Sequence, residues 1–158
     1  MTSADTQFMR RAIAISQQAR EHGNHPFGAI LVDANQRVLL EAENTVVTER
    51  DQTGHAETNL VRLATRSIAP EILTSCTLYS SAEPCAMCAG AIHWANIGRL
   101  VFGVSGPTFY AMVGAAPDLL KISCREILGH AVQPIEVIGP LLEDEALAEH
   151  QGFWQYYG

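Results

Sequence analysis

Apolar residues in the first twenty positions recur at helical spacing. Phe8, Ile13 and Ile15, with alanines between them, predict a helix that Asp5 caps and that ends before Gly23. The next apolar runs are short and continuous, at residues 29–32 and 38–40, and the turn-forming residues 33–36 separate them. This pattern predicts a hairpin of two buried strands, followed by a polar loop over residues 43–54.

From residue 55 onward, helical and strand-like patterns alternate. A helix is expected from residue 55 to Pro70, a strand at 76–79, a helix from Pro84 to Gly98 and a strand at 100–102. The remainder predicts a long functional loop at 103–117, a helix near 117–128, a strand near 132–138 and a final helix from about residue 141. Together these elements predict an α/β fold, a three-layer α/β/α sandwich around a mixed, five-stranded sheet.

Composition narrows the class of protein further. The 158 residues are 47% hydrophobic, enough for one compact domain over 1–158, and the formal net charge of -7 includes no clustered basic patch. Because phosphate contacts dominate the affinity for nucleic acid, a nucleic acid partner is not expected. The N-terminus lacks a secretory pattern and no apolar run could span a membrane, so we expect a cytoplasmic protein.

The candidate chemistry lies at two predicted helix starts. One helix opens with His55, Ala56 and Glu57, and the other carries Cys85 and Cys88 one turn apart. Thiolates are favoured at the positive end of a helix dipole, and two thiolates with one imidazole make three zinc ligands. Three protein ligands leave one zinc position open for water, which is typical of catalytic sites.

Glu57 lies two residues after the histidine, close to the metal without being needed as a ligand. A carboxylate in that place can accept a proton from a zinc-bound water and return it elsewhere, so we expect Glu57 to be catalytic. The alternative is structural zinc, because His93 lies five positions after Cys88. The fourth ligand of such a module would fall at Gly98, which has no ligating side chain. The other two cysteines, Cys76 and Cys124, and the remaining histidines have no partner at ligand spacing.

These residues resemble the signature of the cytidine deaminase superfamily, in which a His-x-Glu segment precedes a Pro-Cys-x-x-Cys segment. The likeness covers roughly residues 8–104 and includes Pro26-Phe27-Gly28-Ala29, Glu83-Pro84-Cys85 and Ala89-Gly90-Ala91. It implies a cytidine deaminase-like fold with one zinc ion per chain. It also implies that a zinc-bound hydroxide replaces a ring amine, which leaves as ammonia.

The resemblance is greatest to the guanine deaminase branch, which implies guanine as the substrate. It also implies substrate contacts at ten positions, namely Phe27, Asn44, Ala56, Glu83, Pro84, Trp94, Asp118, Trp154, Tyr156 and Tyr157. Residues 141–158, a C-terminal helix with an aromatic tail, are expected to cover the active site of the same chain or of a partner in a homodimer. Docking of this tail on its own core is the alternative.

Other substrates stay open. tRNA adenosine deaminases share most of the motif blocks, but the acidic residues of 143–149 would repel an RNA backbone. Cytosine deaminases of fungi are similarly short and also end in an aromatic helix. The segment 106–114 does not closely match the guanine deaminase loop, which leaves room for a nucleoside, a triazine or a pterin.

Overall fold

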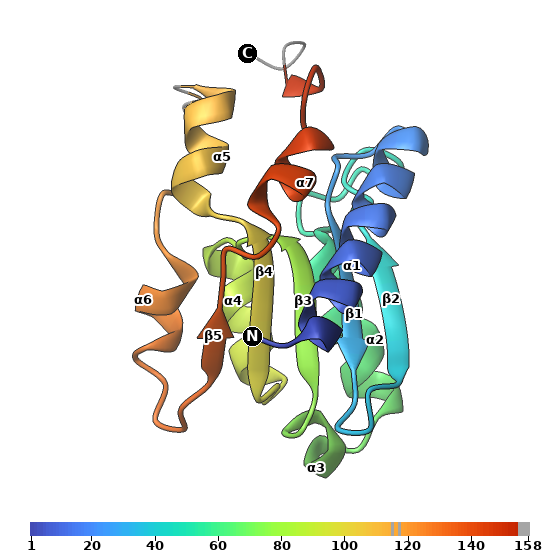
Figure 1. The fold of residues 1–158 in the computed structure, drawn as a ribbon, viewed down its shortest axis with the longest axis vertical. Coiled ribbons are helices and arrows are strands. Elements are labelled where there is room, and N and C mark those ends of the chain that lie inside the picture. The colour runs from blue at the N-terminus through green and yellow to red at the C-terminus, as the bar shows by residue number, and fades with distance from the viewer. Residues whose placement is uncertain (115, 117, 155–158) are drawn as a thin grey trace.

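A mixed, five-stranded sheet forms the centre of the protein, described here from a computed structural model for residues 1–114, 116 and 118–154 (Figure 1). The strand order is β2-β1-β3-β4-β5. Strands β2 and β3 both run antiparallel to β1, whereas β3, β4 and β5 are mutually parallel. The strands are β1 (Gly28–Val32), β2 (Val38–Glu43), β3 (Thr77–Ala82), β4 (Arg99–Val104) and β5 (Glu136–Ile138).

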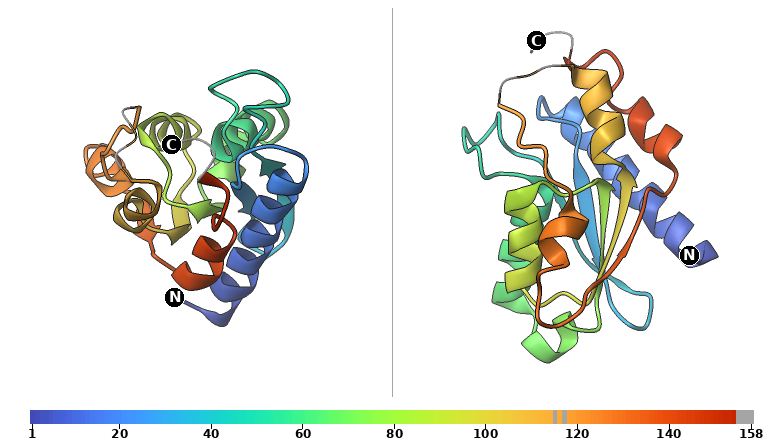
Figure 2. Two further views of the ribbon diagram at one scale, coloured as in Figure 1. Left: turned by 90° about the horizontal axis from the view of Figure 1, so that it is seen from above. Right: turned by 90° about the vertical axis from the view of Figure 1, so that its left-hand side faces the viewer.

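Helices cover both faces of the sheet, which confirms the predicted three layers (Figure 2). One face carries α1 (Ser3–Glu21) and α7 (Glu143–Ala148). The other carries α2 (Ala56–Ser67), α4 (Ala86–Trp94) and α6 (Cys124–Leu128). The short α3 (Pro70–Leu73) leads into β3, and α5 (Gly106–Val113) extends beyond the end of β4 (Figure 1).

The two faces of the sheet bury separate apolar clusters, one beneath each helical layer. Strands β1, β3 and β4 are therefore buried almost throughout, as expected for strands covered on both sides. The prediction of two buried strands in the first hairpin is wrong for β2, whose residues are intermediate or exposed. It is an edge strand, and apolar content alone did not distinguish it from its partner.

Helix α1 begins two residues earlier than its predicted cap. Thr2 is the N-cap and Asp5 is the third residue of a capping box, in which Thr2 and Asp5 exchange hydrogen bonds. The Asp5 carboxylate is buried and accepts from Arg99 and from the Tyr79 hydroxyl, at 2.7–3.0 Å. The Arg99 guanidinium holds the pKa of Asp5 well below its usual range. This pair ties α1 to the centre of the sheet.

The region after β4 differs most from its prediction. Part of the expected loop at 103–117 is helix α5, capped by Ser105 with Pro107 in its first turn. The helix expected near 117–128 begins only at Cys124, after the cap Ser123, and the strand near 132–138 is limited to β5. The final helix begins at Glu143. Among the residues described here, no helix is long and apolar enough to cross a membrane.

Candidate active site

The two predicted helix starts meet at one end of the sheet. His55 is the N-cap of α2 and Cys85 is the N-cap of α4, so each lies where backbone N–H groups create a positive potential. The His55 Nδ1 atom is 3.5 Å from the Sγ atoms of both Cys85 and Cys88. These three ligand atoms lie within 4.8 Å of one another.

The spacing of the three atoms matches the requirements of zinc. A tetrahedral zinc ion with bonds of about 2.0 Å to nitrogen and about 2.3 Å to sulfur keeps such atoms about 3.5 Å apart. No fourth protein ligand completes this group among the residues that the structure describes. When bound, zinc supplies a water molecule whose pKa falls to about 7. The site therefore has the form of a catalytic zinc centre.

The cysteine pair is prepared for a cation by its own hydrogen bonds. A hydrogen bond from Cys88 and the nearby His55 lower the pKa of Cys85 to about 4, although burial of the thiol opposes this shift. The pKa of Cys88 rises well above its usual value because Cys88 donates that bond and is buried. The lowered pKa of Cys85 favours the thiolate, which is the form of cysteine that binds zinc.

Glu57 lies beside Cys88 and is 4% exposed. Its Oε1 accepts a hydrogen bond of 2.7 Å from the Ser80 hydroxyl on β3, and its Oε2 is 3.4 Å from the Cys88 Sγ. Burial raises the pKa of Glu57, although the Ser80 bond opposes this shift. A buried carboxyl with a raised pKa, held at a fixed distance from the ligands, suits reversible proton transfer.

Aromatic rings border this site. Phe27, which precedes β1, makes edge contacts with Phe109 of α5 at 5.8 Å between centroids and lies 6.1 Å from Trp154. Trp154 also meets the His25 ring at 5.2 Å. Phe27 also packs against the apolar cluster that includes Ala56 and Ala89, the neighbours of His55 and Cys88. The described part of the C-terminal segment therefore packs on its own chain, next to the zinc site.

Asn44 lies beside Phe27, because its backbone N–H donates to the Phe27 carbonyl at 3.1 Å. The two ends of its side-chain amide have different surroundings. The Oδ1 atom accepts from the Val46 N–H and so caps its own loop. The Nδ2 group has no hydrogen bond within the described part of the chain, so its two N–H donors remain for a substrate.

Three further predicted contacts belong to the walls of the site. Ala56 and Pro84 are buried next to the ligands. Glu83 has both carboxylate oxygens engaged, since it accepts from the Gly106 N–H at 2.6 Å and from the Ser123 hydroxyl at 3.1 Å. It therefore joins the starts of α5 and α6, and a contact of Glu83 with substrate stays a prediction.

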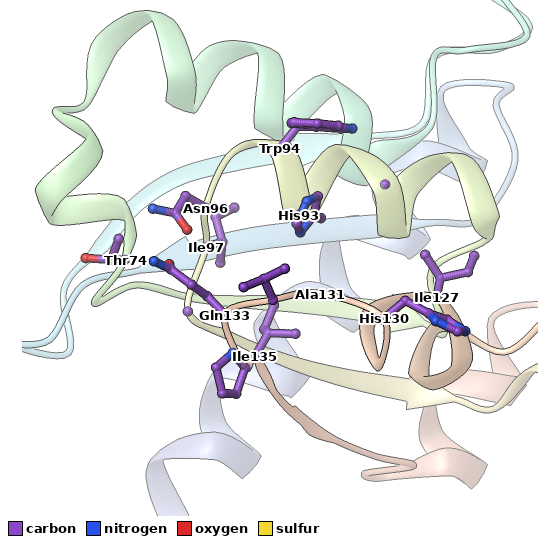
Figure 3. A pocket seen from close by; sticks show the side chains of 14 residues that line it. Thr74, His93, Trp94, Asn96, Ile97, Ile127, His130, Ala131, Gln133 and Ile135 are labelled. Atoms are coloured by element: carbon purple, nitrogen blue, oxygen red, sulfur yellow. The ribbon is translucent and has the colours of Figure 1, made fainter.

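One predicted contact, Trp94, lies at the opposite end of its helix from the zinc ligands. Trp94 is 84% exposed at the far end of α4, beside a groove of about 610 Å³ between α4 and the segment 127–135 (Figure 3). Cys85 caps the start of the nine-residue helix α4 and Trp94 is its last residue, so a helical position alone could not place the ring. Asp118 is exposed in a turn. The predicted contacts Tyr156 and Tyr157 lie outside the described residues.

Sequence reasoning missed four residues that shape the site: Ser80, His25, Phe109 and His150. Ser80 was hidden in a strand pattern, although its place on β3 opposite Ala29 puts it beside Glu57. His25 directly precedes the Pro26-Phe27 block, which was a usable signal. Phe109 and His150 come from segments that only the fold brings to the zinc site.

The fold and site together define a zinc-binding α/β domain with three protein ligands and one buried carboxyl. Residues 2–104 match the family model described as the cytidine and deoxycytidylate deaminase zinc-binding region. The chain belongs to this deaminase family. The match includes His55, Glu57, Cys85 and Cys88, so the predicted family and the predicted zinc cofactor are confirmed.

Relatives within the family differ in the substrates that their names state. The chain is 48% identical over 157 residues, 98% of its own length and 94% of the relative, to a probable cytosine deaminase from Schizosaccharomyces pombe. It is 41% identical over 101 residues, 64% of its length and 58% of the relative, to a tRNA-specific adenosine deaminase from Haemophilus influenzae. The structure of a guanine deaminase from Nitrosomonas europaea superposes with a TM-score of 0.76 at 24% identity, over 90% of this chain and 80% of that one. This last likeness concerns the fold alone.

Proposed function

We propose that the protein is a hydrolytic deaminase of a free nucleobase and that cytosine is its main substrate. The observation that carries the proposal is a zinc-ligand triad with a buried Glu57, bordered by aromatic rings of its own chain. Such a border suits a small flat ring more than a polynucleotide. Similarity to a probable cytosine deaminase over nearly the whole of both chains supports the choice of base.

The chain's own residues would act as follows. Glu57 accepts a proton from the attacking water and passes it to the ring nitrogen adjacent to the carbon under attack. It then carries the water's second proton to the amine, which leaves as ammonia while the ring carbon keeps the oxygen as a carbonyl. Asn44 Nδ2 can donate to a ring carbonyl, and Phe27 offers a ring edge or face for contact.

The carboxylates of the site argue for cytosine over guanine. Each base has a single amino group, which the reaction removes, but guanine has two ring N–H donors where cytosine has one. Guanine therefore needs one more acceptor from the protein, and a free carboxylate would supply it best. Glu83 is engaged by α5 and α6, Glu143 accepts from Ser105 at 2.7 Å, and Asp118 is exposed. Guanine, the base expected from the sequence, remains the second candidate because Phe27 does stand at the edge of the site, where an aromatic ring can contact a purine.

Ammonia release from a panel of substrates tests the proposal. The panel contains cytosine, guanine, adenine, cytidine, ammeline and an unmodified tRNA anticodon hairpin, each incubated with zinc-loaded protein. We expect the highest kcat/KM on cytosine and no release from the hairpin, since the chain carries a net charge of -7. Preference for guanine would replace the proposed base, and activity on the hairpin alone would overturn the proposal of a free nucleobase.

We also propose that two copies pair through the groove beside Trp94. The groove is lined by fourteen residues, none of them Asp, Glu, Lys or Arg. Trp94 and Val132 at its rim are 84% and 98% exposed. A surface of apolar and polar residues without acidic side chains lets two acidic chains meet without bringing carboxylates together. The described tail packs on its own chain, so this pairing does not exchange it.

Replacing Trp94 with Glu is expected to convert the dimer to a monomer, because each copy would place a carboxylate in the apolar contact. Light scattering during size-exclusion chromatography measures the mass directly. The matched control is Val38→Glu, since Val38 is also an exposed apolar residue, at 43%, but lies on β2 away from the groove. A wild-type monomer, or an equal effect of both substitutions, would refute the assigned face.

A further inference from the structure

His150 lies in the turn that follows α7 and is only 1% exposed. Its Nδ1 accepts a hydrogen bond of 3.1 Å from the Trp154 indole N–H, and the two rings stack 14° from parallel with centroids 6.2 Å apart. Gly152, at a φ of 75°, makes the turn that returns the chain over His150. Because Nδ1 accepts, the proton of the neutral imidazole is on Nε2.

That second nitrogen is the feature that packing does not explain. Nε2 is buried and has no hydrogen-bond partner among the described residues. The rings of Phe27 and Phe109 meet the imidazole edge-on at 5.0 and 5.3 Å. A buried donor without an acceptor is destabilising, and a phenylalanine would fill a similar space without that cost. What the imidazole offers and a phenylalanine ring lacks is a hydrogen-bond acceptor for the Trp154 indole N–H.

The tail does not depend on this hydrogen bond for its attachment. Arg20 on α1 donates to the carbonyl oxygens of Glu149 and Gln151 at 2.9 and 2.7 Å. Its guanidinium also lies 5.6 Å from the centre of the Phe153 ring. Loss of the imidazole acceptor would therefore leave the backbone of the tail in place and release only the rotation of the indole.

The orientation of that indole matters because of what it touches. Trp154 meets Phe27, Phe109 and His25, each of which comes from a different part of the wall next to the zinc ligands. Burial keeps His150 neutral at physiological pH, since it lowers the pKa of the imidazole to about 4. The acceptor is therefore present whenever the enzyme works near neutrality.

We propose that His150 is a positioning residue, which fixes the orientation of Trp154 and thereby sets how tightly the active site holds the substrate ring. The effect on substrate binding rests on the proposed deaminase function, whereas the orientation of Trp154 by His150 does not. The zinc ligands and Glu57 make no contact with His150 in the structure, so its effect falls on substrate binding and not on the chemical step.

The first experiment needs no substrate. The chain has two tryptophans, so Trp94→Phe leaves Trp154 as the single tryptophan, which is excited selectively at a wavelength that the four tyrosines do not absorb. In that background, His150→Phe removes the acceptor, whereas His150→Asn keeps an acceptor oxygen near the place of Nδ1. We expect His150→Phe to increase acrylamide quenching of Trp154 about threefold and His150→Asn to leave it close to the parent value. Thermal unfolding of each variant shows whether the fold is kept.

The second experiment compares steady-state kinetics on the best base of the panel. His150→Phe is expected to raise KM about fivefold to tenfold, the effect of one lost hydrogen bond, at unchanged kcat. His150→Asn should restore most of the binding. Trp154→Phe removes the donor and keeps a ring, so its effect on KM should not add to that of His150→Phe.

The outcomes separate this inference from the proposed function. If no base is deaminated, the function fails while the quenching result still decides whether His150 orients Trp154. If His150→Phe changes neither quenching nor KM, or if it lowers kcat as much as it raises KM, the positioning role is overturned. If both His150 variants unfold early, the Trp154→Phe kinetics decide, and an unchanged KM there would also overturn it.

Discussion

Glu57→Gln is expected to lower turnover by about 10²–10⁴-fold while one zinc ion per chain stays bound. The amide fills the space of the carboxyl and still accepts the 2.7 Å hydrogen bond from Ser80, but it cannot take a proton from water. The ligands His55, Cys85 and Cys88 are untouched, so metal content should not change. Metal analysis after gel filtration and single-turnover ammonia release on the same sample measure both quantities.

Ser80→Ala is the matched control for this prediction. It removes the partner of Glu57 but leaves the proton-transfer group, so we expect a loss well below that of Glu57→Gln. It should also raise the pKa of Glu57 further, because the hydrogen bond from Ser80 lowers that pKa against the effect of burial. Full activity of Glu57→Gln, or equal losses in the two variants, would show that another group moves the proton.

The zinc ligands could be predicted from sequence because their spacing is local. Cys85 and Cys88 lie one turn apart at a helix start, and His55 and Glu57 lie two residues apart at another. The order of strands and helices along the chain could also be predicted, because parallel strands that helices cover on both faces have continuous apolar runs. Those two facts are enough to bring the two helix starts to one end of the sheet.

The aromatic border could not be predicted in the same way. Phe27, Phe109 and Trp154 come from three segments whose proximity depends on how α5 and the tail return to the sheet. The helix α5 itself was read as a loop because glycine, proline and small residues surround it, and its cap Ser105 was not recognised. Trp94 was predicted to contact substrate because it is on the zinc-bearing helix, but the length of that helix places it, exposed, at the end opposite the zinc ligands.

Glu83 illustrates why a motif position does not determine a role. It directly precedes the Pro84-Cys85 pair, and on sequence alone it was a candidate substrate contact. The fold uses it to receive the N–H groups at the starts of α5 and α6, including that of Cys124 at 3.1 Å. The identity of hydrogen-bond partners from distant segments cannot be deduced from local spacing, and these partners decide whether a carboxylate is free for substrate.

Cys88→Ala is expected to abolish both zinc binding and activity while leaving the fold intact. Two ligands, His55 and Cys85, hold zinc far more weakly than three, so dialysed protein should retain well below one ion per chain. The α/β core is large and needs no metal, and removal of one buried sulfur should lower Tm by only a few degrees. Metal analysis, near-ultraviolet circular dichroism and thermal unfolding measure the three effects.

Cys76→Ala gives the matched control, because Cys76 is as deeply buried as Cys88, at 1% and 0% exposure, but lies outside the ligand cluster. It should lose a similar amount of stability and keep its zinc and its turnover. If Cys88→Ala unfolded where Cys76→Ala did not, zinc would be a structural requirement of this domain. If Cys88→Ala kept one zinc per chain, the ligand set would be wrong. Loss of zinc from a folded domain is the result that separates a catalytic centre from a structural one.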